Sequence, residues 1–372
     1  MASVPSARCR VLRAFCAATI VIWAPPAAAQ ETQRFAFDTV LSADMFVGEN
    51  VSNRPQVIVD MSGAMRLSDN VQAYFRPWFR LPRPNTPSGA VPDWSKELWQ
   101  AGLRYERPAS GDGLATRVDV GYNISPIGLG VMDNRPSLNP TIAAHMSYVI
   151  PMPAFDPTVP RVSAIAGTYP LGAQVTVSSI HWDARGALLN SAPTRNYAVG
   201  RATRPRQTPV VVAGAGVTPF ASLRVGAAIA YGNYATADEV TGPVRADRKV
   251  AMIAGEVEYA LGFTKVSAEF IRSRFDRIAG SAIAYEYFVQ GLQTMTPRWF
   301  VAGRHESTSA PPLITPTFAG ARTRLAIVEG TVGFRLSPTV TLRGSYHTRK
   351  SYGAAAWDHQ AAASAVWAQR WW

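Results

Sequence analysis

The sequence contains only two cysteines, Cys9 and Cys16, and both lie near its amino end. The rest of the chain therefore has no thiol, no disulfide and no cysteine-based metal site. Lysine is also scarce, since only four of the 37 basic residues are lysine, and there are five histidines. After residue 29 no run of eighteen unbroken apolar residues occurs, which excludes a transmembrane helix from that part of the chain.

The first 29 residues have the composition of a secretory signal peptide. Three arginines precede an apolar run over 14–24, and three alanines at 27–29 provide a small-residue cleavage site. The apolar run is too short to cross a bilayer as a helix. We therefore predict that residues 1–29 direct export and that residues 30–372 form the exported domain.

The charge is strongly basic, with a formal net value of +12 for the whole chain. Loss of the three arginines of the signal peptide leaves 34 basic against 25 acidic residues, a net charge of +9. Because an exported protein does not meet nucleic acid, we expect lipopolysaccharide phosphates or anionic solutes as partners of this charge and no nucleic acid.

Alternation with period two recurs along the exported chain. Residues 97–106, 116–124 and 222–231 each place apolar side chains at every second position and polar, charged or glycine residues between them. Successive side chains of a strand point to opposite faces, so each segment predicts a strand with one apolar and one polar surface. A soluble β-sandwich would show the same alternation. In the first segment the predicted apolar face consists of Trp99, Ala101, Leu103 and Tyr105.

The lengths of the segments and links favour a membrane barrel over a sandwich. The segments run for about ten to thirteen residues, close to a tilted membrane crossing and above the usual length of soluble strands. Strict alternation of short and long links is typical of outer-membrane barrels, with short periplasmic turns and long extracellular loops. We predict short links at 68–70, 108–114, 170–171, 218–221, 261–263, 295–297 and 337–339, and long links at 48–55, 82–95, 125–161, 183–207, 234–247, 276–281, 309–320 and 350–357.

These segments predict an all-β fold, a closed transmembrane antiparallel β-barrel of about sixteen strands, with fourteen to eighteen as the range. The chain ends on "SAVWAQRWW". A free terminus gains nothing from large aromatic rings, whereas a last strand paired with the first would place Trp372 in the aromatic girdle at the periplasmic interface. We therefore expect both termini to be periplasmic.

In these features the chain resembles the bacterial outer-membrane porins over essentially its whole exported length. The resemblance rests on the even strand number, the terminal aromatic Trp372, turn-then-strand segments such as "LSPTVTLRGSYH", and the position of the longest loop. It implies a general or phosphate-selective porin-like fold, recognition of Trp372 by the outer-membrane assembly machinery, and a homotrimer as one oligomeric state. It also implies that loop 125–161 folds into the barrel and narrows the pore, with Asp133, Arg135 and Asp156 as its charged residues.

The inward faces of such a barrel can carry charge because sixteen strands enclose a lumen wide enough for water. The alternation places basic residues inward on the early strands and acidic residues inward on later ones, which predicts a transverse field across the pore. The alternative is solvated polarity with no role in selectivity. The predicted pore-lining residues are Arg76, Arg80, Arg104, Arg117, Glu256, Glu258, Glu269 and Glu286.

The sequence thus predicts a channel for passive diffusion of small hydrophilic solutes or ions through the bacterial outer membrane. A weak anion preference is expected, because loop 183–207 has five arginines against one acid. No cofactor or metal is implied, and the partners are outer-membrane lipid, lipopolysaccharide and small solutes.

Two other functions stay open. A structural or adhesive barrel would use the basic segment 190–207 to bind lipopolysaccharide or a surface partner. An enzyme would need a site such as His145 with Ser147 and Asp133, but no nucleophile elbow, HExxH or phosphate-binding glycine motif occurs. We therefore expect no enzymatic activity.

Overall fold

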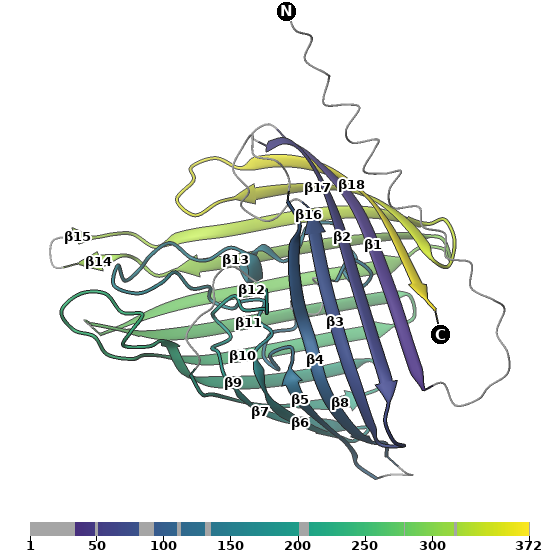
Figure 1. Cartoon of the computed structure of the whole chain (residues 1–372). Helices are drawn as coiled ribbons and strands as arrows, with labels where there is room; N and C mark the ends of the chain where they lie inside the picture. Colours follow the sequence, from purple (N-terminus) through teal and green to yellow (C-terminus); the bar gives the residue numbers. More distant parts are fainter. Residues whose placement is uncertain are drawn as a thin grey trace, which may run out of the picture. The chain divides into compact units, whose positions relative to one another are not determined.

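The computed structural model describes residues 34–48, 51–81, 93–109, 113–130, 135–200, 208–278, 280–315 and 318–371. Sixteen strands form one closed antiparallel barrel in which neighbours in sequence are neighbours in space (Figure 1). The barrel strands are β1 (Phe35–Gly48), β2 (Val51–Arg66), β3 (Val71–Leu81), β4 (Ser95–Arg107), β5 (Ala115–Tyr122), β6 (Leu171–Ser178), β7 (Trp182–Leu189), β8 (Val210–Phe220), β9 (Leu223–Ala235), β10 (Arg248–Leu261), β11 (Thr264–Arg277), β12 (Gly280–Thr294), β13 (Trp299–Ala310), β16 (Thr323–Arg335), β17 (Val340–Lys350) and β18 (Asp358–Arg370).

Three short elements lie outside the barrel wall. A hairpin of β14 (Ile314–Thr315) and β15 (Phe318–Ala319) projects from the link between β13 and β16. A single helical turn, α3 (Met146–Val149), lies in the link between β5 and β6. No helix in the described part of the chain has the length and hydropathy of a membrane span.

Closure of the barrel confirms the predicted fold. β1 pairs with β18 from Asp38 opposite Arg370 to Gly48 opposite Gln360. Beyond the last strand, the Trp371 amide donates to the Phe37 carbonyl, and its indole Nε1 donates to Thr39 Oγ1 at 3.0 Å. Both ends of the described chain are therefore tied to the barrel at the end that carries the short turns. Trp372 and the predicted signal peptide lie outside the described residues.

The outer surface is apolar, as the alternation predicts. On β10 buried and exposed residues alternate strictly from Arg248 to Glu256, and the outward Ile253 is 54% exposed. At the end with the short turns, aromatic side chains form a belt in which the Trp299 and Phe334 rings are in tilted contact at 4.7 Å between centroids. Phe263, in the short turn between β10 and β11, is 73% exposed. Such belts mark a membrane interface in outer-membrane barrels.

Two predicted long links are short in the structure. β1 and β2 are joined by residues 49–50 alone, and β11 and β12 by residues 278–279. In both hairpins the ladder continues almost to the turn, with Gly48 opposite Val51 and Arg277 opposite Gly280. Most of each predicted link belongs to the strands themselves, since residues 51–55 lie in β2 and residues 276–277 and 280–281 lie in β11 and β12. Polar residues such as Asp276 and Ser281 predict a loop, although they pair in the ladder.

The positions of the sixth and seventh strands were also predicted wrongly. The long loop is predicted to end at 161, with a short link at 170–171. In the structure no described residue between Tyr122 and Leu171 belongs to a barrel strand, and the short turn lies at 179–181. Residues 162–166 are almost completely buried, and they pack inside the barrel instead of crossing the membrane. An apolar run without alternation is the signal of such burial.

Candidate functional site in the barrel interior

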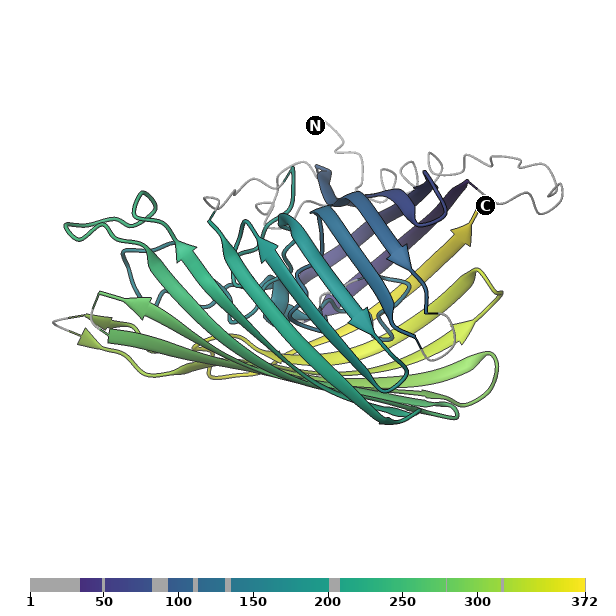
Figure 2. The same ribbon diagram turned by 90° about the horizontal axis from the view of Figure 1, so that it is seen from below.

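The loop over 123–170, hereafter the inner loop, runs inside the barrel. Figures 1 and 2 show it as the teal trace between the strands of opposite walls, and its contacts with the wall reach from β2 to β17. The prediction that the longest loop folds inward agrees with this course, although the loop is longer than 125–161. We use "upper end" for the end with the long loops and "lower end" for the end with the short turns.

Buried glutamates on β11, β12 and β13 bind the middle of the inner loop. Glu269 accepts hydrogen bonds from the Leu129 amide and the Tyr148 hydroxyl. Glu286 accepts from Ser147 Oγ at 3.1 Å. Both glutamates are at most 3% exposed. Their carboxylates therefore hold the inner loop and do not face open water.

The Tyr148 phenol fits this role. Burial, and then the charges of Glu269 and Glu286, raise the pKa of Tyr148 well above its usual range. The hydroxyl therefore stays protonated, and it donates a hydrogen bond to the Glu269 carboxylate.

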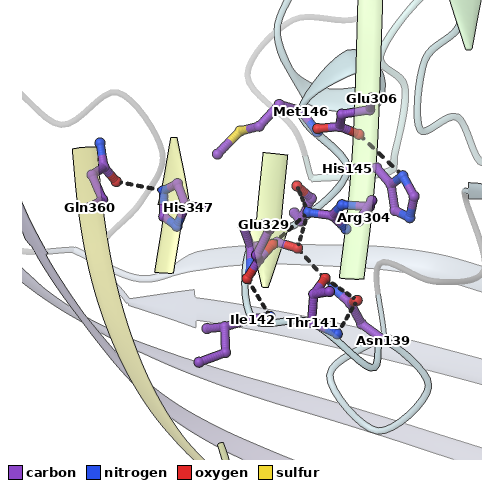
Figure 3. Close-up of polar contacts among 12 residues, drawn as sticks. Asn139, Thr141, Ile142, His145, Met146, Arg304, Glu306, Glu329, His347 and Gln360 are labelled. Carbon is purple, nitrogen blue, oxygen red and sulfur yellow. Dashed lines mark hydrogen bonds and ion pairs between the residues drawn. The ribbon is translucent and has the colours of Figure 1, made fainter. Parts of the chain in front are cut away.

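The next wall contact joins β13 and β16 to the loop (Figure 3). Glu306 Oε1 accepts from the Met146 amide at 2.8 Å, and Glu329 Oε1 accepts from the Ile142 amide at 2.9 Å. Arg304 lies between them and donates both to Glu329 at 3.0 Å and to the Ala143 carbonyl at 2.8 Å. Carboxylates of the wall thus accept hydrogen bonds from backbone amides of the loop, and an arginine donates to a backbone carbonyl of the loop.

Arg343 on β17 completes this arrangement. Its Nη1 donates to the carbonyls of Asn139 at 2.7 Å and of Thr141 at 2.8 Å. A loop buried in a barrel has no ladder partners for its backbone, so each buried amide or carbonyl without a partner would be costly. The charged wall residues provide those partners.

The upper half of the lumen beside β8–β12 contains a dry apolar core. Phe155 and Ile165 of the inner loop pack there, with the Phe155 ring tilted against that of Phe275 on β11 at 5.1 Å between centroids. Inward residues of β8, β10 and β11 join them, and each is at most 1% exposed: Val210, Val212, Met252, Ile271 and Phe275. On β8 both faces are therefore apolar in the upper half, with Val210 and Val212 inward and Val211 57% exposed on the outward side. That pattern in the sequence indicates an inward apolar core, which period-two alternation does not reveal.

A third contact lies on β2–β4. Arg76 donates both Nε and Nη2 to Asp60 at 2.8 Å, and Arg135 of the inner loop lies 3.2 Å from the same carboxylate. The Arg76 guanidinium also lies 4.8 Å from the centre of the Trp99 ring. Arg76 is only 2% exposed, so its charge is neutralised locally and is screened from the lumen.

Trp99 faces inward because of a β-bulge. Arg76 is opposite Gln100 and the next residue, Pro77, is opposite Leu98, so Trp99 has no partner in the register. A bulge turns the following side chains to the other face. The prediction of Trp99 on the outer face is therefore wrong. Its ring stacks between Trp78 and Tyr169, at 4.6 Å from each, and Tyr169 fixes the end of the inner loop.

The lower half of the lumen is charged and partly exposed. Asp119 accepts from Arg104 Nε and Arg117 Nε, each at 2.6 Å. The side chains of Arg117 and Glu106 remain 41% and 47% exposed. This cluster lies below the inner loop, near the turn that joins β4 and β5.

A second charged cluster lies on β7, β9 and β10. Glu256 accepts from Arg185 Nη2 at 2.6 Å and from Arg224 Nη1 at 2.9 Å, and Arg224 also pairs with Asp183 at 2.7 Å. Glu258 is 3.7 Å from Arg224 and its side chain is 37% exposed. Asp183 and Arg185 were predicted to lie in an extracellular loop; they lie instead on the inner face of β7, because β7 begins at Trp182.

The predicted site residues thus separate into groups. Arg104 and Arg117 share one carboxylate, Glu256 and Glu258 share Arg224, and Glu269 and Glu286 lie beneath the inner loop. Arg80 donates to Gln56 and lies apart from the Arg104 cluster. In the inner loop, Arg135 reaches Asp60, whereas Asp156 accepts from Thr158 within its own turn. Asp133 lies outside the described residues.

The candidate catalytic pair is buried in the loop contact. Ser147 is 1% exposed and donates to Glu286, while His145 is fully buried with its Nδ1 3.2 Å from Glu306. Both side chains hold the loop to the wall. Within the described residues no group of three or more His, Cys, Asp or Glu is arranged to hold a metal ion.

The barrel is similar to several solved outer-membrane proteins. It aligns with OmpF of Salmonella typhi, solved in complex with daunomycin, with a TM-score of 0.59 and 11% identity over 90% of this chain and 97% of that chain. Outer-membrane expressed OmpT of Vibrio cholerae aligns with a TM-score of 0.58 and 9% identity over 92% and 100%. An anion-selective porin from Comamonas acidovorans aligns with a TM-score of 0.54 and 10% identity over 90% and 99%.

No family model matches the sequence, and no curated protein sequence matches it. At these low identities the structural likeness shows the fold alone. The predicted resemblance to porins is confirmed at that level: the chain has the sixteen-stranded architecture of outer-membrane porins.

Proposed function

We propose that this chain is an outer-membrane channel for passive diffusion of small hydrophilic solutes or ions, narrowed by the inner loop. The observation that carries this proposal is the course of that loop across a closed sixteen-stranded barrel, bound to the wall from β2 to β17. A loop held at many points inside a water-permeable barrel narrows the pore, and so it limits the size of the solutes that pass.

The proposal includes export and outer-membrane assembly. Residues 1–29 would be removed as a signal peptide, and Trp372 would serve as the assembly signal. The strand ends tied together by Trp371 then face the periplasm. Trimer formation through the apolar outer face is compatible with this function and is not required by it.

A weak anion preference is part of the proposal. The exposed inward charges of the lower lumen include Arg66, Arg117, Lys265 and Arg370 against Glu106 and Glu258, a small positive excess. Arg76 contributes little because Asp60 neutralises it. The preference would therefore come from the lower lumen and not from Arg76 and Arg80, the predicted pore-lining residues on β3.

Single-channel recording of the refolded protein in a planar lipid bilayer tests this function. We expect stepwise currents of stable size, smaller than those of a sixteen-stranded barrel with an empty lumen. A correctly folded barrel that inserts without conducting would contradict the proposal.

A second candidate is a structural barrel that does not conduct. The observation that favours it is the dry core of the upper half, where Phe155 and Ile165 fill the space beside β8–β12. Such a barrel would act through its extracellular loops. The same recording separates the two functions, because only the channel gives currents. The buried Ser147 and His145 give no support to an enzyme, and we propose none.

A further inference from the structure

The lipid-facing side of β11–β16 carries arginines near the upper end of the barrel. Arg272 and Arg274 occupy outward positions of β11, and Arg324 occupies an outward position of β16. The register connects them, because Arg272 is opposite Tyr285, Tyr285 is opposite Ser309, and Ser309 is opposite Arg324. We call the following four residues the outer arginine row: Arg272, Arg274, Arg322 and Arg324.

One arginine of the row contacts an aromatic side chain that lies between the others in the register. The Arg322 guanidinium lies 5.6 Å from the centre of the Tyr285 ring and donates to the Ile283 carbonyl at 3.0 Å. Three interstrand steps of about 4.8 Å separate the Cα atoms of Arg272 and Arg324, roughly 14 Å in all. Arginine side chains can extend across half of that span, so their guanidinium groups can contact a single headgroup beside Tyr285.

The depth of the row places it at a membrane interface. Phe334 in the aromatic belt and Arg324 are both outward residues of β16, ten positions apart. With a rise of about 3.3 Å per residue and a tilt of about 40°, they are separated by about 25 Å along the membrane normal. The apolar band of outer-membrane barrels has about this height, so the row lies where lipid headgroups begin.

The row is not neutralised by the protein. No carboxylate among the described residues forms an ion pair with any of its four arginines, and Asp276 is the one acidic residue on the outward side of β11. By contrast, the outward positions of β5–β9, which the structure describes in full, carry no charged residue. The outer arginine row therefore has no counterpart on the wall formed by β5–β9.

We propose that the outer arginine row binds the phosphate groups of a lipopolysaccharide molecule in the outer leaflet. Arginine on a lipid-facing strand is unfavourable against hydrocarbon, and that cost falls towards the interface, where an anionic headgroup can pair with it. Guanidinium groups match phosphate oxygens with paired, charge-assisted hydrogen bonds. The inference rests on the proposed outer-membrane orientation and is independent of whether the lumen conducts.

Binding of purified lipopolysaccharide to the refolded protein in detergent tests this site. The probe is used intact and after enzymatic removal of its phosphates. A cation near an anionic lipid surface strengthens binding roughly fivefold, so R272S/R274S/R324S should weaken binding of the intact probe about a hundredfold. The control is R161S/R245S, which removes two exposed loop arginines at the upper end, against three in the test variant, and should change binding less than about threefold.

Three outcomes would overturn the proposal: equal binding of the dephosphorylated probe, full binding by the triple variant, or an equal loss in the loop control. A change of oligomeric state in the triple variant, measured by light scattering, would assign the row to contacts between copies and would also overturn it. The triple variant should keep the circular dichroism spectrum and single-channel conductance of the unaltered chain. The conductance of the unaltered chain tests the channel separately, so failure of one proposal leaves the other standing.

Discussion

The upper and lower halves of the lumen solve the same problem in different ways. In the upper half the inner loop packs against apolar side chains of the strands, such as Ile271 and Phe275. The buried charged side chains there form hydrogen bonds with the loop backbone. In the lower half the inward charges pair with one another and stay partly exposed, as Arg117 does. The interior of the barrel is thus partly a packed protein core and partly a wall of charged side chains exposed to water. Only the exposed charges can influence which ions pass.

Removal of the loop should have the largest effect on this difference. Deletion of residues 135–155 takes away the segment bound to Asp60, Glu306 and Glu329, and we expect single-channel conductance to rise several-fold. The control is deletion of residues 242–246 in the link between β9 and β10, which should leave conductance unchanged. Equal conductance of the first deletion and the intact protein would show that the loop does not limit the current.

The fold was predictable from sequence because the membrane imposes period-two patterns and paired turns. Alternation such as that of β9 survives as an outward row of exposed residues, including Ile229 and Tyr231. Alternation failed at Trp99, because a bulge changes the face without changing the composition. It also failed at residues 162–170, since a segment that fills the lumen needs apolar residues on every side.

The site was predictable only as a list of inward positions. Whether an inward charge meets water depends on what covers it, and that is decided by contacts between residues far apart in sequence. Glu269 and Glu258 have the same character in the sequence, yet one is buried beneath Tyr148 and the other is partly exposed. No periodicity distinguishes them.

Loss of a buried ion pair should cost more than loss of an exposed one. Arg76→Ala leaves Asp60 in a buried position with only Arg135 beside it, and we expect the free energy of unfolding to fall by about 3–5 kcal/mol. Arg117→Ala leaves Asp119 paired with Arg104, and its effect should be about 0–1 kcal/mol. Urea titration of barrels refolded in lipid measures both. Similar losses would contradict the division of the lumen into dry and aqueous parts.

Removal of one methylene should distinguish the dry inner face from the lipid-facing surface. Ile271 is fully buried against the inner loop, so Ile271→Val should reduce the free energy of unfolding by about 0.5–1.5 kcal/mol. Ile253 on the neighbouring strand is 54% exposed and faces outward, and Ile253→Val should have an effect of less than about 0.5 kcal/mol. The same urea titration applies. If the second substitution costs as much as the first, the upper lumen is not packed as a protein core.

The smallest expected effect concerns ion selectivity in the lower lumen. Arg117 and Glu258 have side chains that are 41% and 37% exposed, so each faces the water through which ions would pass. Arg117→Ala should shift the reversal potential in a potassium chloride gradient towards cations, and Glu258→Ala should shift it towards anions. Exposed charges act within a Debye length of about 8 Å at physiological salt, so both shifts should be a few millivolts and should disappear near 1 M salt. Lys96→Ala, on the outward side of β4, alters the same charge away from the lumen and should cause no shift. Shifts of equal sign for Arg117→Ala and Glu258→Ala would place these two side chains off the ion path and would remove the basis for an anion preference.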